Sequence, residues 1–187
     1  MSDDNFLEDF GQSIADSAEG FLVALQSISR EEQAATAIPL LLLCTSQIVA
    51  AGARLGVQQA FEPEEEFQPD VGPDPDLDEM RIRLAAILGD LDTYAHNFEP
   101  YDPDTVPAQL SDDLTSMAAD VANGLKHFRA GNLVEALWWW QFSYLSNWGS
   151  IGCGVMSALH SVIAHDALDT DIDDADQVAV ADEVLGD

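Results

Sequence analysis

The segment EALWWWQFSYLSNWGSIGCG holds four tryptophans and is the strongest candidate for a binding site. When Leu133–Trp148 is wound as a helix at about 100° per residue, more than half of its circumference is apolar. Trp138, Trp140 and Trp148 fall within or beside this apolar arc, so we expect them in the core. Trp139 falls on the polar side. We expect it either to be covered by another segment, such as an acidic tether, or to line a pocket or an interface.

Gln141 lies within the apolar arc of the same helix, where its amide must find hydrogen-bond partners. It belongs either to a structural network or to a polar contact for a ligand. The binding residues predicted from this segment are Trp139, Gln141, Trp138 and Asn147.

Histidines and cysteines are the side chains that most often hold a metal ion or act as a nucleophile. No two histidines stand at i, i+4 and no HExxH motif occurs, so the sequence predicts no zinc helix. Cys44 and Cys153 lie in apolar segments, which favours buried free thiols over a disulfide framework. A catalytic Cys153 would need a nearby base. We predict no catalytic residue, no metal site and no cofactor, and we expect each histidine to be exposed or hydrogen-bonded. The histidines are His96, His127, His160 and His165.

Two further segments match ligand loops only in part. The tail begins with Asp169, Asp171 and Asp173, as a calcium loop does. However, Asp174 and Val180 stand where such a loop needs glycine and a bidentate glutamate. The GSIGCG run lacks a GK[ST] motif and a preceding strand, so it is not a phosphate loop. Its small residues are expected to let two helices approach closely or to let the chain kink.

The charge of the chain excludes several functions. Its 187 residues carry 35 Asp and Glu but six Lys and Arg, which gives a formal net charge of −29. Nucleic-acid binding needs a cationic footprint, and anionic lipid is disfavoured for the same reason. The acidity fits a soluble protein of a salt-rich cytoplasm. Alternatively, it forms a docking surface for a basic partner or mimics a nucleic acid.

Apolar residues recur at helical spacing along most of the chain, and no run predicts a strand. Two segments rich in proline and acid, FEPEEEFQPDVGPDPD and EPYDPDTVP, break this pattern and predict tethers. The expected helices cover about residues 4–27, 36–55, 77–94, 111–128, 133–148 and 150–168.

Capping residues mark several of these helix ends. Asp76 is expected to cap the third helix, and Ser111 the fourth. Gly131 is a natural left-handed residue at the end of the fourth helix, and Asn132 can cap the aromatic helix at once. These signals predict a tight helical hairpin in front of the tryptophans.

The sequence therefore predicts an all-α, single-domain bundle of five or six helices over residues 1–168, with its main tether at about 61–75. An acidic tail, 169–187, is predicted to be disordered. The first residues carry no basic segment of the kind that opens a signal peptide. The longest apolar run, 37–44, is interrupted by Pro39 and is too short to span a bilayer. We expect a cytoplasmic location and no membrane contact.

The most distinctive stretches are LKHFRAGNLVEALWWWQFSYLSNWGS, the ALHSVIAH that follows it, LLLLCTSQIVAAGARLG and EPYDP. In these stretches the chain resembles a family of bacterial proteins known as domain of unknown function 5063. The resemblance covers most of the chain before the tail. It implies a helical cytoplasmic protein, and it implies no reaction, cofactor or catalytic residue.

Three functions remain open on these grounds. The leading hypothesis is a non-enzymatic module that binds a small ligand or a protein partner with a basic surface. The second is an enzyme or metal-dependent protein with a site between helices. The third is an acidic mimic of nucleic acid. The surroundings of Trp139 and Gln141 are the features that distinguish them best.

Overall fold

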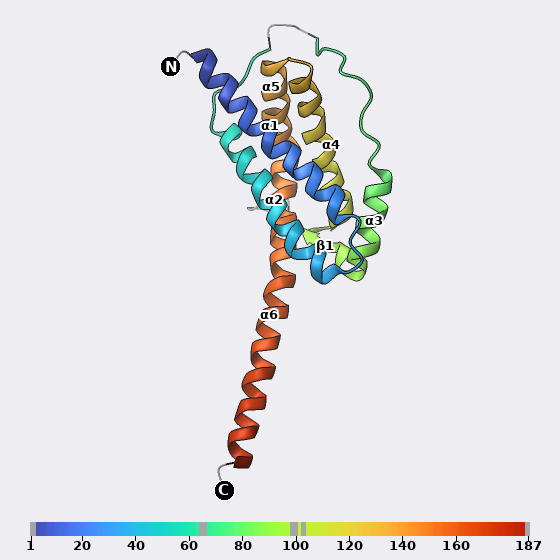
Figure 1. The fold of residues 1–187 in the computed structure, drawn as a ribbon, viewed down its shortest axis with the longest axis vertical. Coiled ribbons are helices and arrows are strands. Elements are labelled where there is room, and N and C mark those ends of the chain that lie inside the picture. The colour runs from blue at the N-terminus through green and yellow to red at the C-terminus, as the bar shows by residue number, and fades with distance from the viewer. Residues whose placement is uncertain (1–2, 64–66, 98–100, 102–103, 186–187) are drawn as a thin grey trace.

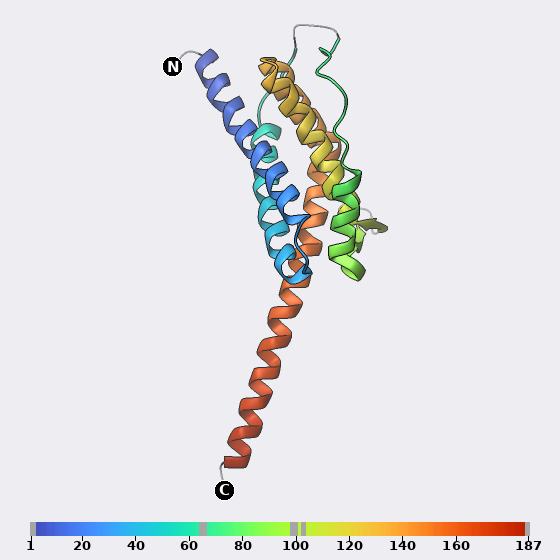
Figure 2. The same cartoon turned by 45° about the vertical axis from the view of Figure 1, so that its right-hand side comes forward.

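The helices pack side by side into one elongated bundle, and α6 continues beyond it (Figures 1 and 2). The computed structural model describes residues 3–63, 67–97, 101 and 104–185, with side chains described between 5 and 168. The elements are α1 (Asp3–Ile28), α2 (Ala34–Gly56), α3 (Asp78–Leu88), a 3₁₀ turn η1 (Gly89–Asp92), β1 (Thr93–His96), β2 (Val106–Gln109), α4 (Leu110–Arg129), α5 (Leu133–Ser143), a π-helical segment η2 (Tyr144–Trp148) and α6 (Gly149–Leu185). The predicted all-α domain is confirmed, with a small two-stranded sheet added to it.

Two tryptophans fill the centre of the bundle, and glycines on neighbouring helices make room for them. Trp140 and Trp148 are each 1% exposed. A Cβ atom at Gly124 of α4 would overlap the Trp140 indole, and one at Gly52 of α2 would overlap Trp148. Because interiors are close-packed, these two glycines set how near α4 and α2 can approach the tryptophans.

The β1–β2 pair corrects the prediction that the chain contains no strand. The strands are antiparallel, and Thr93 pairs with Gln109 at one end and His96 with Val106 at the other. The expected third helix therefore ends early, at Leu88, and Tyr94 lies on β1 rather than on that helix. Tyr94 continues the helical spacing of the apolar stripe, but pairing with a distant segment decides its conformation.

The N-terminus of α4 is capped by a residue that is far away in sequence. Asp92 accepts hydrogen bonds from the Ser111 backbone N at 2.8 Å and from Ser111 Oγ at 2.9 Å. The prediction that Ser111 itself caps the helix is wrong, because α4 begins one residue earlier, at Leu110. A carboxylate at this position also interacts favourably with the helix dipole. Asp92 thus joins the end of η1 to the start of α4.

In the turn between α4 and α5, the prediction is confirmed for Gly131 but not for Asn132. Gly131 has φ = 85°, the left-handed conformation expected of it. Asn132 occupies the N-cap position of α5, but its side chain makes no capping hydrogen bond. Asp76 likewise accepts a bond from the Asp78 backbone N at 3.2 Å without being the N-cap of α3, which is Leu77.

The aromatic helix buries less of its apolar arc than the sequence predicts. Phe142 is 52% exposed and Leu145 is 66% exposed, while Trp138 is half-buried. The bundle covers one side of this helix, so an arc wider than that side leaves apolar residues in solvent. The prediction of Trp138 as a core residue is therefore corrected.

The last helix is longer than expected. α6 reaches Leu185, where the sequence predicted an end near Leu168. Side chains beyond Leu168 lie outside the described residues, and the division into a bundle and a disordered tail stays a prediction. By length and composition alone, α2 and the stretch Leu133–Leu168 are long and apolar enough to cross a membrane, although 39% of the α2 window is buried in the bundle. Core helices pass the same test, so this is weak evidence.

Candidate functional site

Trp139 lines a cavity between the first tether and α4, which we call the tether cavity. The indole is half-buried, and its Nε1 donates to the Asp120 carbonyl oxygen at 3.0 Å. The cavity has a volume of about 450 Å³. Trp139 is therefore shielded on one side by α4 and faces tether residues on the other. The side chains around it include Gln68, Asp70, Asp74, Asp120, Asn123 and His127.

Asn147, a second predicted binding residue, comes close to Trp139 through Asp120. Its Nδ2 donates to Asp120 Oδ2 at 2.8 Å. Burial raises the pKa of the Asp120 carboxyl group above its ordinary value, and the hydrogen bond from Asn147 opposes this shift. The structure thus brings Trp139 and Asn147 together at one residue of α4.

The tether is held against α4 by two side chains that the sequence did not single out for this role. His127 is fully buried, and its Nε2 lies 2.6 Å from Gln68 Nε2. Burial, and then the neighbouring Lys126 charge, lower the pKa of His127. Lys126 Nζ donates to the carbonyl oxygens of Gly72 at 3.3 Å and Pro73 at 2.9 Å. The His127 imidazole and the Lys126 ammonium group therefore hold the first tether at two points.

Gln141 does not join this cavity, because it binds the other end of the first tether. Its Nε2 donates to the Leu55 carbonyl oxygen at 2.9 Å, and its Oε1 accepts from the Phe61 backbone N at 3.1 Å. Gln141 is 6% exposed. Its contacts are those of the structural network that was one of the two interpretations of this residue.

Trp138, the fourth predicted binding residue, faces outward beside Phe142. The two rings stack with centroids 5.3 Å apart and planes inclined by 4°. Trp138 also lies 6.0 Å from the Trp139 ring. The four predicted residues are thus divided among the tether cavity, the end of α2 and the surface.

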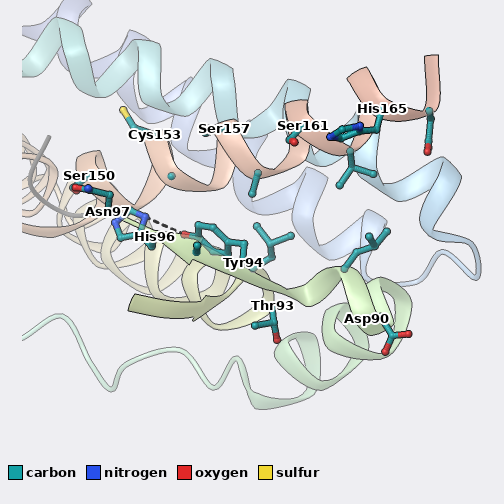
Figure 3. Close-up of a pocket in the computed structure, with 17 residues that line it drawn as sticks. Asp90, Thr93, Tyr94, His96, Asn97, Ser150, Cys153, Ser157, Ser161 and His165 are labelled. Atoms are coloured by element: carbon teal, nitrogen blue, oxygen red, sulfur yellow. Dashed lines mark hydrogen bonds between the residues drawn. The ribbon is translucent and has the colours of Figure 1, made fainter. Parts of the chain in front are cut away.

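A larger cavity, the hairpin cavity, lies between the β1–β2 pair and α6 (Figure 3). Its volume is about 960 Å³. Ser150, Ser157 and Ser161 face it from one side of α6, and Leu110 and Val162 add apolar surface. From β1 and the residues beside it come Asp90, Thr93, Tyr94, His96 and Asn97. None of these residues was predicted to bind a ligand.

The Tyr94 hydroxyl is a polar group of the hairpin cavity that is held in place by hydrogen bonding. Its hydroxyl donates to Asp113 Oδ2 at 2.7 Å and lies 3.4 Å from His96 Nδ1. Burial, and then the Asp113 carboxylate, raise the pKa of Tyr94 far above its ordinary value. Burial also raises the pKa of Asp113, against the opposing hydrogen bond from Tyr94. The phenol is therefore a neutral hydrogen-bonding group at any ordinary pH.

Cys153 lines the same cavity but is not arranged as an activated nucleophile. Its side chain is exposed, which corrects the prediction of a buried thiol, whereas Cys44 is buried as predicted. Desolvation raises the pKa of the Cys44 thiol to about 11. In Figure 3 the Cys153 sulfur points away from His96, which packs against Gly154. Among the described residues, no group of three or more histidine, cysteine or acidic side chains is placed to hold a metal ion.

The sequence missed the hairpin cavity because its walls meet only in the folded chain. The serines stand at spacings of seven and four on α6, so a helical wheel places them on one face. That pattern gives no sign of what packs opposite. The opposing wall is a short strand whose four residues, TYAH, look like the end of a helix.

Comparison with known proteins places the fold in a family. A crystal structure of protein BF1032 from Bacteroides fragilis is similar, with a TM-score of 0.63 and 20% sequence identity over 80% of this chain and 89% of that one. At this identity the likeness shows the fold alone. No curated protein matches the chain. The model of the family described as domain of unknown function DUF5063 matches residues 5–165. This range takes in the aromatic helix, the tether cavity and all of the hairpin cavity except Asp166. The chain belongs to that family.

Proposed function

We propose that this protein is a non-enzymatic helical module that binds a small, uncharged polar molecule in the hairpin cavity. The observation that carries the proposal is the composition of the cavity walls. They combine hydroxyl, imidazole and amide groups with apolar patches, in a volume of about 960 Å³. Sites for small ligands have this size and this mixture of apolar surface with a few fixed polar groups.

The charges around the hairpin cavity decide the class of ligand. Among the described residues that line it there is no Lys or Arg, so no permanently charged cation there neutralises a phosphate or a carboxylate. Asp90 and Asp166 stand exposed at its edge, and the chain as a whole carries −29 charges. An anion is therefore repelled during approach as well as in the site.

The hydrogen-bonding groups favour a molecule with several hydroxyl or amide groups. Ser157 and Ser161 present hydroxyls that donate and accept, and Tyr94 Oη has acceptor capacity left after donating to Asp113. Leu91, Ala158 and Val162 offer apolar surface for the flat or ring-shaped face of the same molecule. A sugar or nucleoside has this combination of an apolar face and a hydroxylated rim.

We propose binding without catalysis because the Cys153 side chain is not oriented toward a base. A thiol nucleophile needs a base within hydrogen-bond reach, about 3 Å. The side chains of Cys153 and His96 point in different directions (Figure 3). The polar groups of the cavity are therefore suited to recognition.

Binding is tested by NMR titration of the labelled protein with methyl glucoside, adenosine and adenosine monophosphate. We expect one of the uncharged probes to shift the amide signals of Tyr94 and Ser157, with no shift from the charged nucleotide. Ser157→Trp, which places a bulky indole among the polar groups of the cavity, should abolish the response. His160→Trp is the matched control, because His160 is exposed on the same helix and does not line the cavity. Tighter binding of the nucleotide than of adenosine, or no response to either uncharged probe, would contradict the proposal.

A further inference from the structure

The acidic residues of this chain are unevenly distributed. Of its 35 acidic residues, none lies within 33–61 or within 136–165. Arg54 is the single basic residue, Lys or Arg, in these two segments. The remainder of the chain therefore holds all 35 acidic residues and five of the six Lys and Arg, which is a formal net charge of −30.

The fold places these two acid-free segments against each other. A Cβ atom at Gly152 of α6 would meet Val49 of α2, and one at Gly56 of α2 would lie 3.6 Å from Leu145 Cδ2. In both Figure 1 and Figure 2, α2 runs alongside the upper part of α6. One side of the bundle is thus built from segments without a carboxylate.

This side also exposes large apolar side chains, and we call it the acid-free face. Leu43 and Ala50 of α2 and Val57, the residue that follows the helix, stand seven apart, so they form one stripe. Leu43 is 55% exposed and Val57 is 81% exposed. Across the Gly56 contact the surface continues to Leu145 and Phe142, which are 66% and 52% exposed.

We propose that the acid-free face is the docking surface for a second copy of this chain. Two copies that each carry −29 charges repel strongly, and the repulsion is weakest where both contact surfaces lack carboxylates. A two-fold axis brings the same patch of each copy together, so an uncharged patch meets an uncharged patch. A basic partner gains nothing here, because its charges pair with carboxylates on the other sides of the bundle.

A lipid surface fits the acid-free face less well. Lipid-binding helices carry basic residues that hold the headgroups, and this face has Arg54 alone among the described residues. Arg54 is already engaged, since its Nη1 donates to Ser13 Oγ at 3.0 Å and its guanidinium lies 5.3 Å from the Phe10 ring centre. Membrane binding is therefore an outcome that the test must separate from dimerisation.

The size of the face suits a modest dimer. α2 has 23 residues, which corresponds to a length of about 34 Å. With a neighbouring helix packed about 9 Å away, a strip two helices wide offers roughly 700 Å². Stable dimers bury about 800 Å² per partner, so we expect a dimer that forms readily once salt screens the remaining charge.

Sedimentation velocity of the full chain, in reducing buffer with 0.5 M KCl, is the test. We expect the wild type to dimerise and Leu43→Glu or Val57→Glu to raise the dissociation constant about tenfold or more. Val23→Glu is the matched control. It adds the same charge at an apolar site that is 61% exposed, on α1, where Val23 lines a separate cavity with Pro75 and Arg83. It should dimerise as the wild type does.

The outcomes distinguish the alternatives. A wild type that stays monomeric at all concentrations, or a Val23→Glu control that dissociates as much as Leu43→Glu, overturns the proposal. A monomer in solution that floats with neutral phosphatidylcholine vesicles, and loses this binding in Leu43→Glu, shows a lipid-facing surface and also overturns it. Circular dichroism of each variant verifies that its helices are retained.

Discussion

Gln141 offers the sharpest test of how the first tether is attached to the bundle. Its amide bonds to the Leu55 carbonyl oxygen and the Phe61 backbone N at 2.9 and 3.1 Å. Two longer contacts, both 3.3 Å, reach the carbonyl oxygens of Gln58 and Gln59. Replacing Gln141 by Leu keeps the approximate volume and removes all four contacts.

The expected cost follows from the groups left without a partner. The hydrogen bond to the Leu55 oxygen is buried and the one from the Phe61 N–H is partly buried, and both are shorter than the contacts to Gln58 and Gln59. Gln59 is exposed and Gln58 is half-buried, so their oxygens can bond water instead. A buried polar group without a partner costs about 1–3 kcal/mol, and the lower half of this range applies to groups that are partly accessible. Two such groups give an expected loss of about 2–4 kcal/mol for Gln141→Leu.

Urea denaturation followed by circular dichroism measures this loss. Limited proteolysis between residues 57 and 61 reports whether the tether is released locally. Gln26→Leu is the matched control, because Gln26 is an exposed helical glutamine with no side-chain hydrogen bond described. A Gln141→Leu variant within about 0.5 kcal/mol of the control, which is the usual range for surface substitutions, would refute the reasoning.

Gln141→Glu adds a dependence on pH. Its ionised carboxylate would face the Leu55, Gln58 and Gln59 carbonyl oxygens, so its folded-state pKa is raised above the unfolded value. Stability relative to wild type should therefore be greater at low pH and fall as pH rises through the folded pKa. A loss of stability that does not depend on pH would mean that the carboxylate has moved out of the site.

Four further predictions concern the core, the turn and the charge. Trp140→Ala should lower the free energy of unfolding in urea by about 3–5 kcal/mol, because the indole is buried and donates to the Val121 oxygen at 2.9 Å. Trp139→Ala should leave most of the stability in place, and equal losses in the two variants would contradict this. Gly131→Val should lower the melting temperature, because φ = 85° strains a β-branched residue, and an unchanged value would mean that the turn adapts. Asp120→Asn should stabilise the protein at pH 7, because the raised pKa of Asp120 makes its ionised form unfavourable in the folded state. This gain in stability should vanish below about pH 3.9, where the carboxyl group is protonated in both states. Urea denaturation of wild type and variant at pH 7 and at a pH below about 3.9 tests the prediction. The melting temperature should rise with KCl, and a flat dependence up to molar salt would exclude repulsion as a major contribution.

Helix positions were predictable where local spacing and packing agree. The stripe of α1, the glycine at residue 131 and the burial of Trp140 follow from periodicity and backbone conformation, which are properties of short segments. The β1–β2 pair was not predictable in the same way. Its four-residue strands gain their stability from pairing across the intervening segment, and Tyr94 fits a helical stripe equally well.

The candidate sites depend on contacts that the sequence does not encode locally. Trp139 was singled out by its place on the helical wheel, but its partner Asp120 lies 19 residues earlier, on another helix. Gln68 and His127 meet across 59 residues. The exposure of Phe142 could not be anticipated, because an apolar arc reveals nothing about how many neighbours are available to cover it.

The π-helical segment between α5 and α6 marks a point at which the number of residues can change by one without turning the helix that follows. The Gly149 N–H bonds to the Tyr144 oxygen, five residues back, so this turn holds one residue more than an α-helical turn. Five residues of π-helix turn the chain about as far as four residues of α-helix, so deleting one residue from 144–148 would restore α-helical spacing and leave the direction of α6 nearly unchanged. Val155 and Leu159, both fully buried, would therefore still face the core. A single-residue deletion at this point should consequently disturb α6 less than a single-residue deletion in the middle of α4, which would rotate the rest of that helix by about 100°.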